Sequence, residues 1–290
     1  MDPRDLAIVG AGRVGTALAV LLQRSGHRVV AVSGRDASRK RAARHLRDVP
    51  FVPMLEAARR AEVVLVGLPD DRILPVCETL ASRGAFRGGQ WVAHLSGSQP
   101  LEVLSPARGG GAGLLSVHPL QTFPDVQAAL ARIPGAAMAV TAEGDEGYAL
   151  GEGIAAGAGG RSFRLADERK PLYHAAAVFC SNYLAVVEGI AEGLFARAGL
   201  PDPLAAFAPL AEATFANVME RGPAGALTGP VARGDAGTVR RNLEALGAEA
   251  PEAVAAYVAL ADAAARLAGD AGRLTPEARA GVEEVLAAWR

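Results

Sequence analysis

Three glycines near the start of the chain have the spacing of a phosphate-binding turn. The sequence LAIVGAGRVGTALAVLL places Gly10, Gly12 and Gly15 between an apolar run and a helical stretch. In this pattern the first glycine permits a tight turn, the second lets a pyrophosphate approach the backbone, and the third lets helix and strand pack closely. The helix N-terminus adds free N–H groups and the positive end of its dipole. The predicted cofactor contacts in this turn are Gly10, Ala11, Gly12, Arg13, Val14 and Gly15.

The end of the second apolar run, VVAVSGRD, favours NADP over NAD. A domain that binds NAD usually carries an acid here for the ribose hydroxyls, whereas this sequence has Ser33 and Arg35. A hydroxyl and a guanidinium both suit a 2′-phosphate. Asp36 is the alternative, because its carboxylate can be the ribose-binding acid displaced by a few positions. A solvated surface turn is the other alternative, and NADP is the predicted cofactor.

Two further segments place polar side chains after apolar runs. VVLVGLPDDRI ends in Leu68, Pro69 and Asp70, where the acid is expected to begin a helix as cap and dipole partner rather than to bind a metal. WVAHLSGS places Ser96 after the next run, with His94 packed inside it. Because ligands gather at the carboxyl ends of parallel strands, we expect Leu68, Pro69 and Asp70 beside the cofactor and Ser96 near the nicotinamide or substrate.

His118 is the residue best suited to proton transfer. In GLLSVHPLQTFPD it ends an apolar run, directly before Pro119. A hydride delivered to a carbonyl leaves an alkoxide, and a histidine that titrates near neutrality can donate the proton that the alkoxide needs. The alternative is that His118 only forms hydrogen bonds with the backbone of the loop.

An α/β fold is needed to bring these segments together. Short apolar runs alternate with helical stretches, which predicts a parallel sheet covered on both faces. The predicted strands are Leu6 to Val9, Arg28 to Ser33, Val63 to Leu68, Trp91 to Leu95, Gly113 to His118 and Ala136 to Thr141. From about Asp167 the composition becomes helical. We therefore predict a Rossmann dinucleotide-binding domain at 1–165 and a mostly helical substrate and dimerisation domain at 166–290.

Composition and charge narrow the classes of partner. The chain has 290 residues, 50% of them hydrophobic, and a formal net charge of −1, so no overall field favours nucleic acid or an anionic membrane. Two cysteines, Cys77 and Cys180, cannot build a disulfide framework or a zinc cluster. The apolar region from Ala175 to Ala196 contains Asn182 and two glutamates, which are costly in lipid. We expect a cytoplasmic protein with no metal, nucleic-acid or membrane partner.

The order of motifs resembles one group of reductases. GAGRVG, LPDD, HLSGS, SVHPLQTFPD, LYHAAAVFCSNYLAVVEG and LTGPVARGD follow one another over roughly residues 5 to 260. This order is similar to Rossmann-like reductases that carry a C-terminal domain of uncharacterised function. These belong to the superfamily of 6-phosphogluconate dehydrogenase, pyrroline-carboxylate reductase, ketopantoate reductase and prephenate dehydrogenase. The resemblance implies that His118 handles the substrate hydroxyl near the nicotinamide, and that Ser96 is the serine after the preceding strand.

The helical domain supplies further candidate residues. On an α-helix, Lys170, His174 and Ser181 fall within about 40° of one another, with Asn182 beside them. Related hydroxyacid dehydrogenases place a lysine here with an asparagine four residues on, whereas this sequence has His174 after Lys170. Lys170 is therefore expected to be solvated, and His174 and Asn182 are the predicted substrate contacts or, alternatively, structural. Arg233 is expected either to bind a substrate carboxylate or to form a surface ion pair with Asp235 or Glu220.

Together these features predict an NADP-dependent oxidoreductase that reduces a small, ketopantoate-like 2-oxo acid. His118 is the expected proton donor, with Ser96, His174 and Asn182 around the carbonyl. One alternative is an imine reductase that resembles pyrroline-carboxylate reductase. Another is a regulatory protein that senses NADP without turnover, because a cofactor site is not by itself an active site. The expected partners are a small carbonyl or imine substrate bearing a carboxylate and a second copy of the chain.

Overall fold

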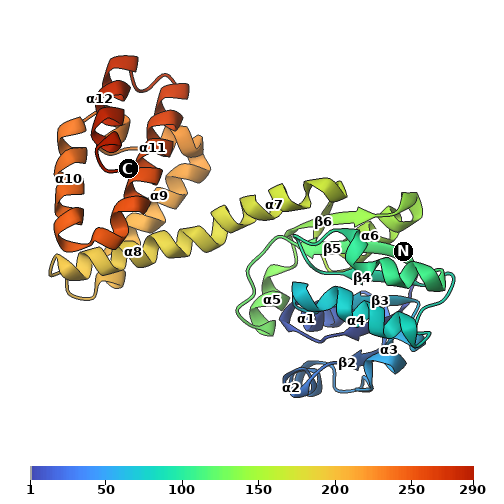
Figure 1. Ribbon diagram of the computed structural model, residues 1–290. Helices are drawn as coiled ribbons and strands as arrows, with labels where there is room; N and C mark the ends of the chain where they lie inside the picture. The colour runs from blue at the N-terminus through green and yellow to red at the C-terminus, as the bar shows by residue number, and fades with distance from the viewer. Residues whose placement is uncertain (1) are drawn as a thin grey trace. The chain divides into compact units, whose positions relative to one another are not determined.

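The computed structural model describes residues 2–290. These residues form two compact units, of which the first ends at Asn182 and the second comprises Tyr183–Arg290. The first is an α/β domain and the second is helical (Figure 1). The units divide inside a run of consecutive helical segments, later than the predicted boundary at 165/166. The reason is that Asp167 and Lys170, which begin this run, bond to residues of the α/β domain.

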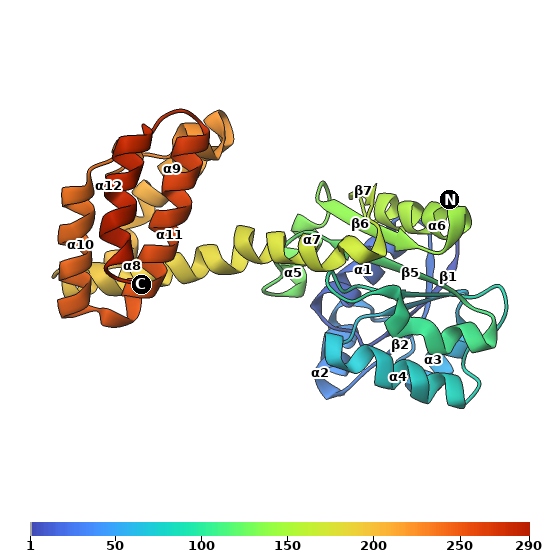
Figure 2. The ribbon, with the colours of Figure 1, turned by 45° about the horizontal axis from the view of Figure 1, so that its top comes forward.

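Among residues 2–290, seven strands form one sheet in the order β2-β1-β3-β4-β5-β6-β7. Figure 2 shows β6 and β7 on the side of the sheet away from β2. The strands are β1 (Asp5–Val9), β2 (Arg28–Ser33), β3 (Val63–Val66), β4 (Trp91–His94), β5 (Gly113–Pro119), β6 (Ala137–Ala142) and β7 (Arg161–Arg164). Six of these were predicted, within one or two residues at their ends. β7 was missed because its sequence, RSFR, has one apolar residue and no apolar run.

The sheet is parallel except for one pair. β5 and β6 are antiparallel, whereas a wholly parallel sheet was predicted. Because β6 runs antiparallel to β5, the connection of residues 120–136 joins the carboxyl end of β5 to the adjacent start of β6. Pro119 lies opposite Met138 there. This connection carries the short helix α5 (Val126–Arg132).

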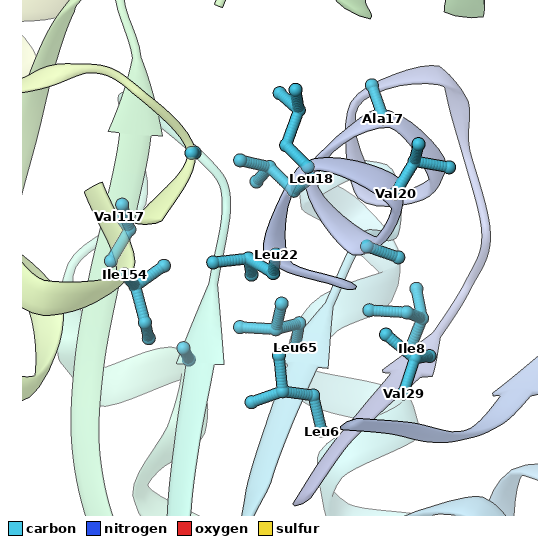
Figure 3. Packing of buried hydrophobic residues seen from close by; sticks show 14 of the residues in the cluster. Leu6, Ile8, Ala17, Leu18, Val20, Leu22, Val29, Leu65, Val117 and Ile154 are labelled. Atoms are coloured by element: carbon cyan, nitrogen blue, oxygen red, sulfur yellow. The ribbon is translucent and has the colours of Figure 1, made fainter. Parts of the chain in front are cut away.

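Alternate residues of each strand point to opposite faces and build two cores. Leu6 and Ile8 face helices α1 (Arg13–Arg24), α5 and α6 (Gly144–Gly157), and Figure 3 shows them with Leu65 near Leu18 and Leu22 of α1. The intervening strand residues, such as Ala7, face the other set of segments. That set comprises α3 (Met54–Arg60), α4 (Asp70–Ser82) and the 3₁₀ segment η1 (Leu101–Gly110). Helix α2 (Asp36–His45) follows the edge strand β2.

Strand register brings the predicted site segments together at the carboxyl ends of the parallel strands. Val9 lies beside Val66, Val66 beside His94, and His94 beside Ser116. These four strands are mutually parallel, so the turns that follow them all emerge at their carboxyl ends. In an open α/β sheet this edge is where ligands bind.

The helical run in which the two units divide contains a π-helical segment. It consists of η2 (Asp167–Arg169), α7 (Lys170–Ala177), the π-helical segment η3 (Val178–Tyr183) and α8 (Leu184–Arg197). The second unit continues with α9 (Pro203–Ala226), η4 (Val231–Arg233), α10 (Ala236–Glu249), α11 (Pro251–Asp270) and α12 (Pro276–Ala287). Residues of α10, α11 and α12 form its main core, which includes Val239, Leu243, Ala265 and Val282.

Candidate active site and cofactor site

The glycine-rich turn after β1 has the geometry that its spacing predicts. Gly10 has φ of +85°, and a Cβ there would lie 2.4 Å from Cδ2 of Leu68. The N–H groups of Gly10 and Ala11 donate to the carbonyl oxygen of Ser33 at 3.1 and 3.0 Å. A Cβ on Gly15 would lie 3.3 Å from Cγ2 of Ile8, so helix and strand pack closely here. The turn therefore forms the kind of backbone cradle that accepts a pyrophosphate.

Gly67 is a further member of this cradle that the sequence analysis did not identify. A Cβ on Gly67 would lie 2.7 Å from the carbonyl oxygen of Gly10, so only glycine fits without movement of the backbone. The signal in the sequence was a glycine directly after the apolar run VVLV. Glycine at the end of a strand often marks such a close approach of two backbones.

The end of β2 corrects one part of the cofactor prediction. Ser33 is fully buried, and its hydroxyl donates to the carbonyl oxygen of Ile8 at 3.3 Å. This hydroxyl is therefore committed to the inside of the domain and does not offer a bond to a 2′-phosphate. Arg35 is exposed at the start of α2, and Asp36 begins that helix. Of the predicted phosphate contacts at this strand end, only the guanidinium of Arg35 is accessible.

Lys170 lies inside the domain, contrary to the prediction that it is solvated. Its side chain is 1% exposed, and Nζ donates to Oγ of Ser116 at 2.5 Å and to the carbonyl oxygen of Ser96 at 3.3 Å. Burial lowers its pKa to about 8, while the carboxylates of Asp167 and Asp70 oppose this shift. The prediction failed because position 170 was judged by its place before Pro171, and its long side chain reaches the edge of the sheet. A buried amine with a pKa near neutrality is characteristic of functional sites.

Asp70 and Asp167 hold the loop after β4 around this lysine. Oδ2 of Asp70 accepts from the hydroxyls of Ser96 and Ser98 at 3.0 and 2.6 Å. The carboxylate of Asp167 accepts from the backbone N–H of Leu101 at 3.0 Å. Asp70 also lies in the first turn of α4, as predicted for a dipole partner, but without a side-chain capping bond.

His118 pairs with a tyrosine that the sequence analysis did not identify. Nδ1 of His118 and the hydroxyl of Tyr173 are 2.8 Å apart, and the two rings meet edge to face. Burial, with smaller effects of Lys170 and His174, lowers the pKa of His118 to about 4. Burial also raises the pKa of Tyr173 to about 12. At pH 7 the imidazole is therefore neutral and the phenol keeps its proton, so His118 is a hydrogen-bonding group here rather than an imidazolium.

The His118 ring packs directly against the backbone of Gly97. A Cβ at this position would lie 2.7 to 2.9 Å from three atoms of the imidazole. We expect Gly97→Ala to displace the ring from Tyr173 and to lower turnover at least tenfold, because small displacements of positioned groups are costly in catalysis. The measurement is NADPH oxidation by a confirmed substrate.

Gly88→Ala is the matched control, because a Cβ at Gly88 meets nothing within 4 Å. Both variants should melt within a few degrees of the wild type. Equal turnover of Gly97→Ala and Gly88→Ala would contradict a role for the position of His118.

The remaining predicted residues lie in different places. His174 is half-buried next to Tyr173 and close enough to His118 to lower its pKa. Asn182 is exposed in the π-turn, about 18 Å along the helix from Lys170 at 1.5 Å per residue. The α-helical angles predicted for Ser181 and Asn182 fail there, because a π-turn advances less per residue. The structure therefore groups His174 with His118 and Ser96, and separates Asn182 from them within the first unit.

Arg233 ends the short segment η4 of the second unit and is exposed. In residues 2–290 it has no ion pair within 4.0 Å, so the predicted surface pair is not formed. Asp235 instead caps helix α10 by accepting from the N–H of Thr238. Binding of a carboxylate by Arg233 stays a prediction.

Fold and site together define a protein with a Rossmann-type α/β domain and a polar cluster at the carboxyl ends of its parallel strands. Comparison with family models agrees: a Rossmann-like domain matches residues 3–119, and a domain of unknown function, DUF2520, matches residues 136–264. The chain is a Rossmann-like protein with a DUF2520 C-terminal domain, as its motif order predicted.

Solved structures share this architecture over most of the chain. A Bacteroides fragilis protein, described provisionally as an NADP oxidoreductase, is 25% identical with a TM-score of 0.75, and the match covers 91% of this chain and 98% of that one. A Thermotoga maritima protein matches over the same shares with 23% identity and a TM-score of 0.68, which shows the fold alone.

A curated relative comes from Synechococcus. Its glycerol-3-phosphate dehydrogenase [NAD(P)+] is 27% identical over 205 residues, which are 67% of this chain and 56% of that protein. The chain thus matches little more than half the length of this relative. The printed descriptions of these relatives name NADP- or NAD(P)-dependent oxidoreductases, and they do not distinguish NADP from NAD for this chain.

Proposed function

We propose that the chain is an NADPH-dependent reductase of a small oxo acid, with Lys170 as the proton source. The observation that carries this proposal is the buried Lys170 amine, with a pKa of about 8, at the edge where the glycine-rich turn would hold the cofactor phosphates. The backbone cradle of Gly10, Gly12 and Gly67 fits a pyrophosphate, because a Cβ on any of them would lie within 3.3 Å of a neighbouring atom. Nicotinamide supplies hydride when bound.

The chain's own residues complete the reduction. As the carbonyl carbon gains hydride, its oxygen gains negative charge and takes one proton, which gives the alcohol. Lys170 is mostly protonated at pH 7 and holds that proton on Nζ, while two of its three N–H groups bond to Ser116 and Ser96. When the Tyr173 hydroxyl donates to Nδ1 of His118, the proton of the neutral imidazole is on Nε2, from which it can orient the carbonyl oxygen. His118 thus changes from the predicted acid to a positioning donor.

The positive charge of Lys170 favours a carbonyl over an imine. An iminium substrate carries positive charge, which a neighbouring ammonium in a poorly solvated site opposes. A developing alkoxide is stabilised by the same ammonium. Relatives by fold include both kinds of enzyme, since a ketol-acid reductoisomerase and a reductive aminase match at 18% identity each.

A substrate screen tests this proposal against its alternatives. NADPH oxidation is followed with pooled 2-oxo acids and, separately, with pooled cyclic imines. Turnover with the oxo acids supports the proposal, and turnover with imines alone replaces it by imine reduction. Binding of NADPH by fluorescence with no turnover in either pool indicates a regulatory protein that senses the cofactor.

We also propose that the second unit dimerises through α8 and α9. These helices leave large apolar side chains uncovered, among them Leu210, Phe215 and Met219, which are 59 to 72% exposed. They also line an apolar cavity of about 680 Å³ that contains Phe195 and Phe207. Contiguous apolar surface of this kind marks an interaction site.

A second copy of the chain is the occupant that we infer, because Glu188 and Glu212 also line this cavity and are costly against hydrocarbon. In the described residues, the continuous helical stretch Asp167–Arg197 is long and apolar enough to cross a membrane, by length and composition only. An 18-residue window of this stretch has a mean hydropathy of 1.3 and contains no buried residue.

Light scattering during size exclusion should therefore give twice the 29.7 kDa mass of the chain. Phe215→Glu should shift the protein toward the monomer, while Arg221→Glu on the same helix should not. A monomeric wild type, or one that sediments with phosphatidylcholine vesicles, would contradict the proposal.

A further inference from the structure

A pocket of the first unit shares no residue with the Lys170 cluster and is strongly basic. It has a volume of about 660 Å³ and lies between the start of α1, one side of α2 and the start of α5. Its charged and titratable lining residues are Arg13, Lys40, Arg41, Arg44, His45 and Asp125. We call this the basic pocket. Its volume lies within the range of small-molecule sites.

The positive charge of the basic pocket is not neutralised within the described residues. None of its arginines and neither Lys40 nor His45 has a carboxylate within 4.0 Å there, although surface ion pairs are frequent elsewhere in the chain. The carboxylate of Asp125 is committed to capping α5, where Oδ1 accepts from the N–H of Ala128 at 2.8 Å. Burial, followed by the charges of Arg44 and Arg41, lowers the pKa of His45.

Two features fix this charge next to the cofactor turn. Nη1 of Arg41 donates to the carbonyl oxygen of Ala11 at 2.6 Å, so its guanidinium rests against the glycine-rich segment. Arg13 is the first residue of α1, whose first turn contains no acid and whose N-cap Gly12 provides no side-chain capping bond. The positive end of the helix dipole therefore adds to the charge of the side chains.

A phosphoryl group satisfies this arrangement. It carries up to two negative charges and three acceptor oxygens, which guanidinium groups bind through paired, charge-assisted hydrogen bonds. A carboxylate offers one charge and two oxygens, fewer than the four cations of the pocket can use. The volume exceeds what inorganic phosphate fills, so the phosphoryl group would belong to a larger molecule.

We propose that the basic pocket binds the phosphoryl group of a small organic molecule, with Lys40 and Arg44 as direct contacts. Neither Ser33 nor Arg35 lines the pocket, so its lining residues differ from those that predicted NADP at the end of β2. The phosphoryl group has two sources: the 2′-phosphate of NADP, in which case the inference rests on the proposed cofactor, or a separate phosphorylated metabolite. The same variants distinguish these sources.

The test is isothermal titration of the full chain with NADPH, NADH, adenosine 2′,5′-bisphosphate and inorganic pyrophosphate. The variant is Lys40→Gln with Arg44→Gln, two exposed positions whose change leaves the Arg41 bond intact. The control is Arg39→Gln on the same helix, because the guanidinium of Arg39 lies 4.4 Å from the ring centroid of Phe51 and does not line the pocket. Melting temperatures verify that all three proteins are folded.

We expect the double variant to weaken at least one phosphoryl probe by tenfold to a hundredfold, and the control to change it less than threefold. If the double variant loses affinity for NADPH and for the bisphosphate while its affinity for NADH is unchanged, the pocket binds the 2′-phosphate. If the double variant loses affinity for pyrophosphate while its affinity for NADPH is unchanged, the pocket binds a separate phosphorylated ligand. The same loss should then be measured in protein saturated with NADPH. Equal affinities of the double variant and the control for every probe would overturn the proposal. Failure to find a reducible substrate leaves these binding results unaffected.

Discussion

Lys170→Met should lower kcat by roughly two to four orders of magnitude, the range expected when a proton donor is lost. Methionine fills a similar volume without an ionisable group, so the variant should still fold. NADPH affinity should change little, because Lys170 bonds to Ser116 and Ser96 and not to the glycine-rich turn. Stopped-flow NADPH oxidation with the substrate found in the screen gives the measurement. A variant that keeps wild-type kcat removes Lys170 from the mechanism.

The pH profile distinguishes Lys170 from His118 as the proton source. With the pKa of Lys170 at about 8, log kcat/KM should be level around pH 7 and fall with a slope near −1 above pH 8. An imidazolium donor with an ordinary pKa would instead make the rate fall above about pH 6.5. The pKa of His118, at about 4, places its titration outside this range. A fall centred near pH 6.5 would restore His118 as the acid.

The pH dependence of the free energy of unfolding should reveal the lowered pKa of Lys170 without any substrate. The pKa of Lys170 is lower when folded, about 8, than its unperturbed value of 10.5, so between these values the unfolded chain binds more protons than the native one. The free energy of unfolding then rises with pH in this window. Relative to Lys170→Met, the wild type should gain about 3 kcal/mol between pH 8 and 10.5, measured by urea titration. No relative gain would mean that the amine is solvated.

The second large effect concerns the choice of cofactor. NADPH should bind at least about tenfold more tightly than NADH, since a net difference of about 1.4 kcal/mol corresponds to tenfold. Arg35 is exposed at the end of β2 and is free to bind a 2′-phosphate there. Arg35→Ala should therefore weaken NADPH while NADH changes little, and the preference should shrink as salt screens the contact. Fluorescence titration of both cofactors measures it.

Asp36→Ala is the matched variant for this experiment. Asp36 lies in the first turn of α2, where its carboxylate also favours the helix dipole. If Asp36 binds the ribose, the wild type will prefer NADH and Asp36→Ala will weaken NADH. That result would reverse the interpretation of the SGRD segment as an NADP signature.

The elements and the glycine-rich turn were predictable because each depends on a local pattern. Apolar runs, helix periodicity and the three glycines report on neighbours in the sequence. The Lys170 cluster was not predictable in this way, because its bond to Ser116 joins residues 54 positions apart. His118 was identified as a site residue, yet its ionisation depends on burial and on Lys170, neither of which the SVHP segment encodes. The commitment of Ser33 to Ile8 is likewise a property of the packed sheet.

The antiparallel pairing of β5 with β6 also bears on how this protein can vary. The segment 120–136 begins and ends at the same end of the paired strands. It therefore does not have to run back along the length of the sheet, as a crossover connection between parallel strands must. Insertions or deletions there can be absorbed locally, with every other strand kept in register. Pro124 and Asp125 of this segment line the basic pocket, and Pro119, just before it, follows His118. Loop exchange between homologues at this one segment is therefore a route to new ligand preferences on an unchanged scaffold.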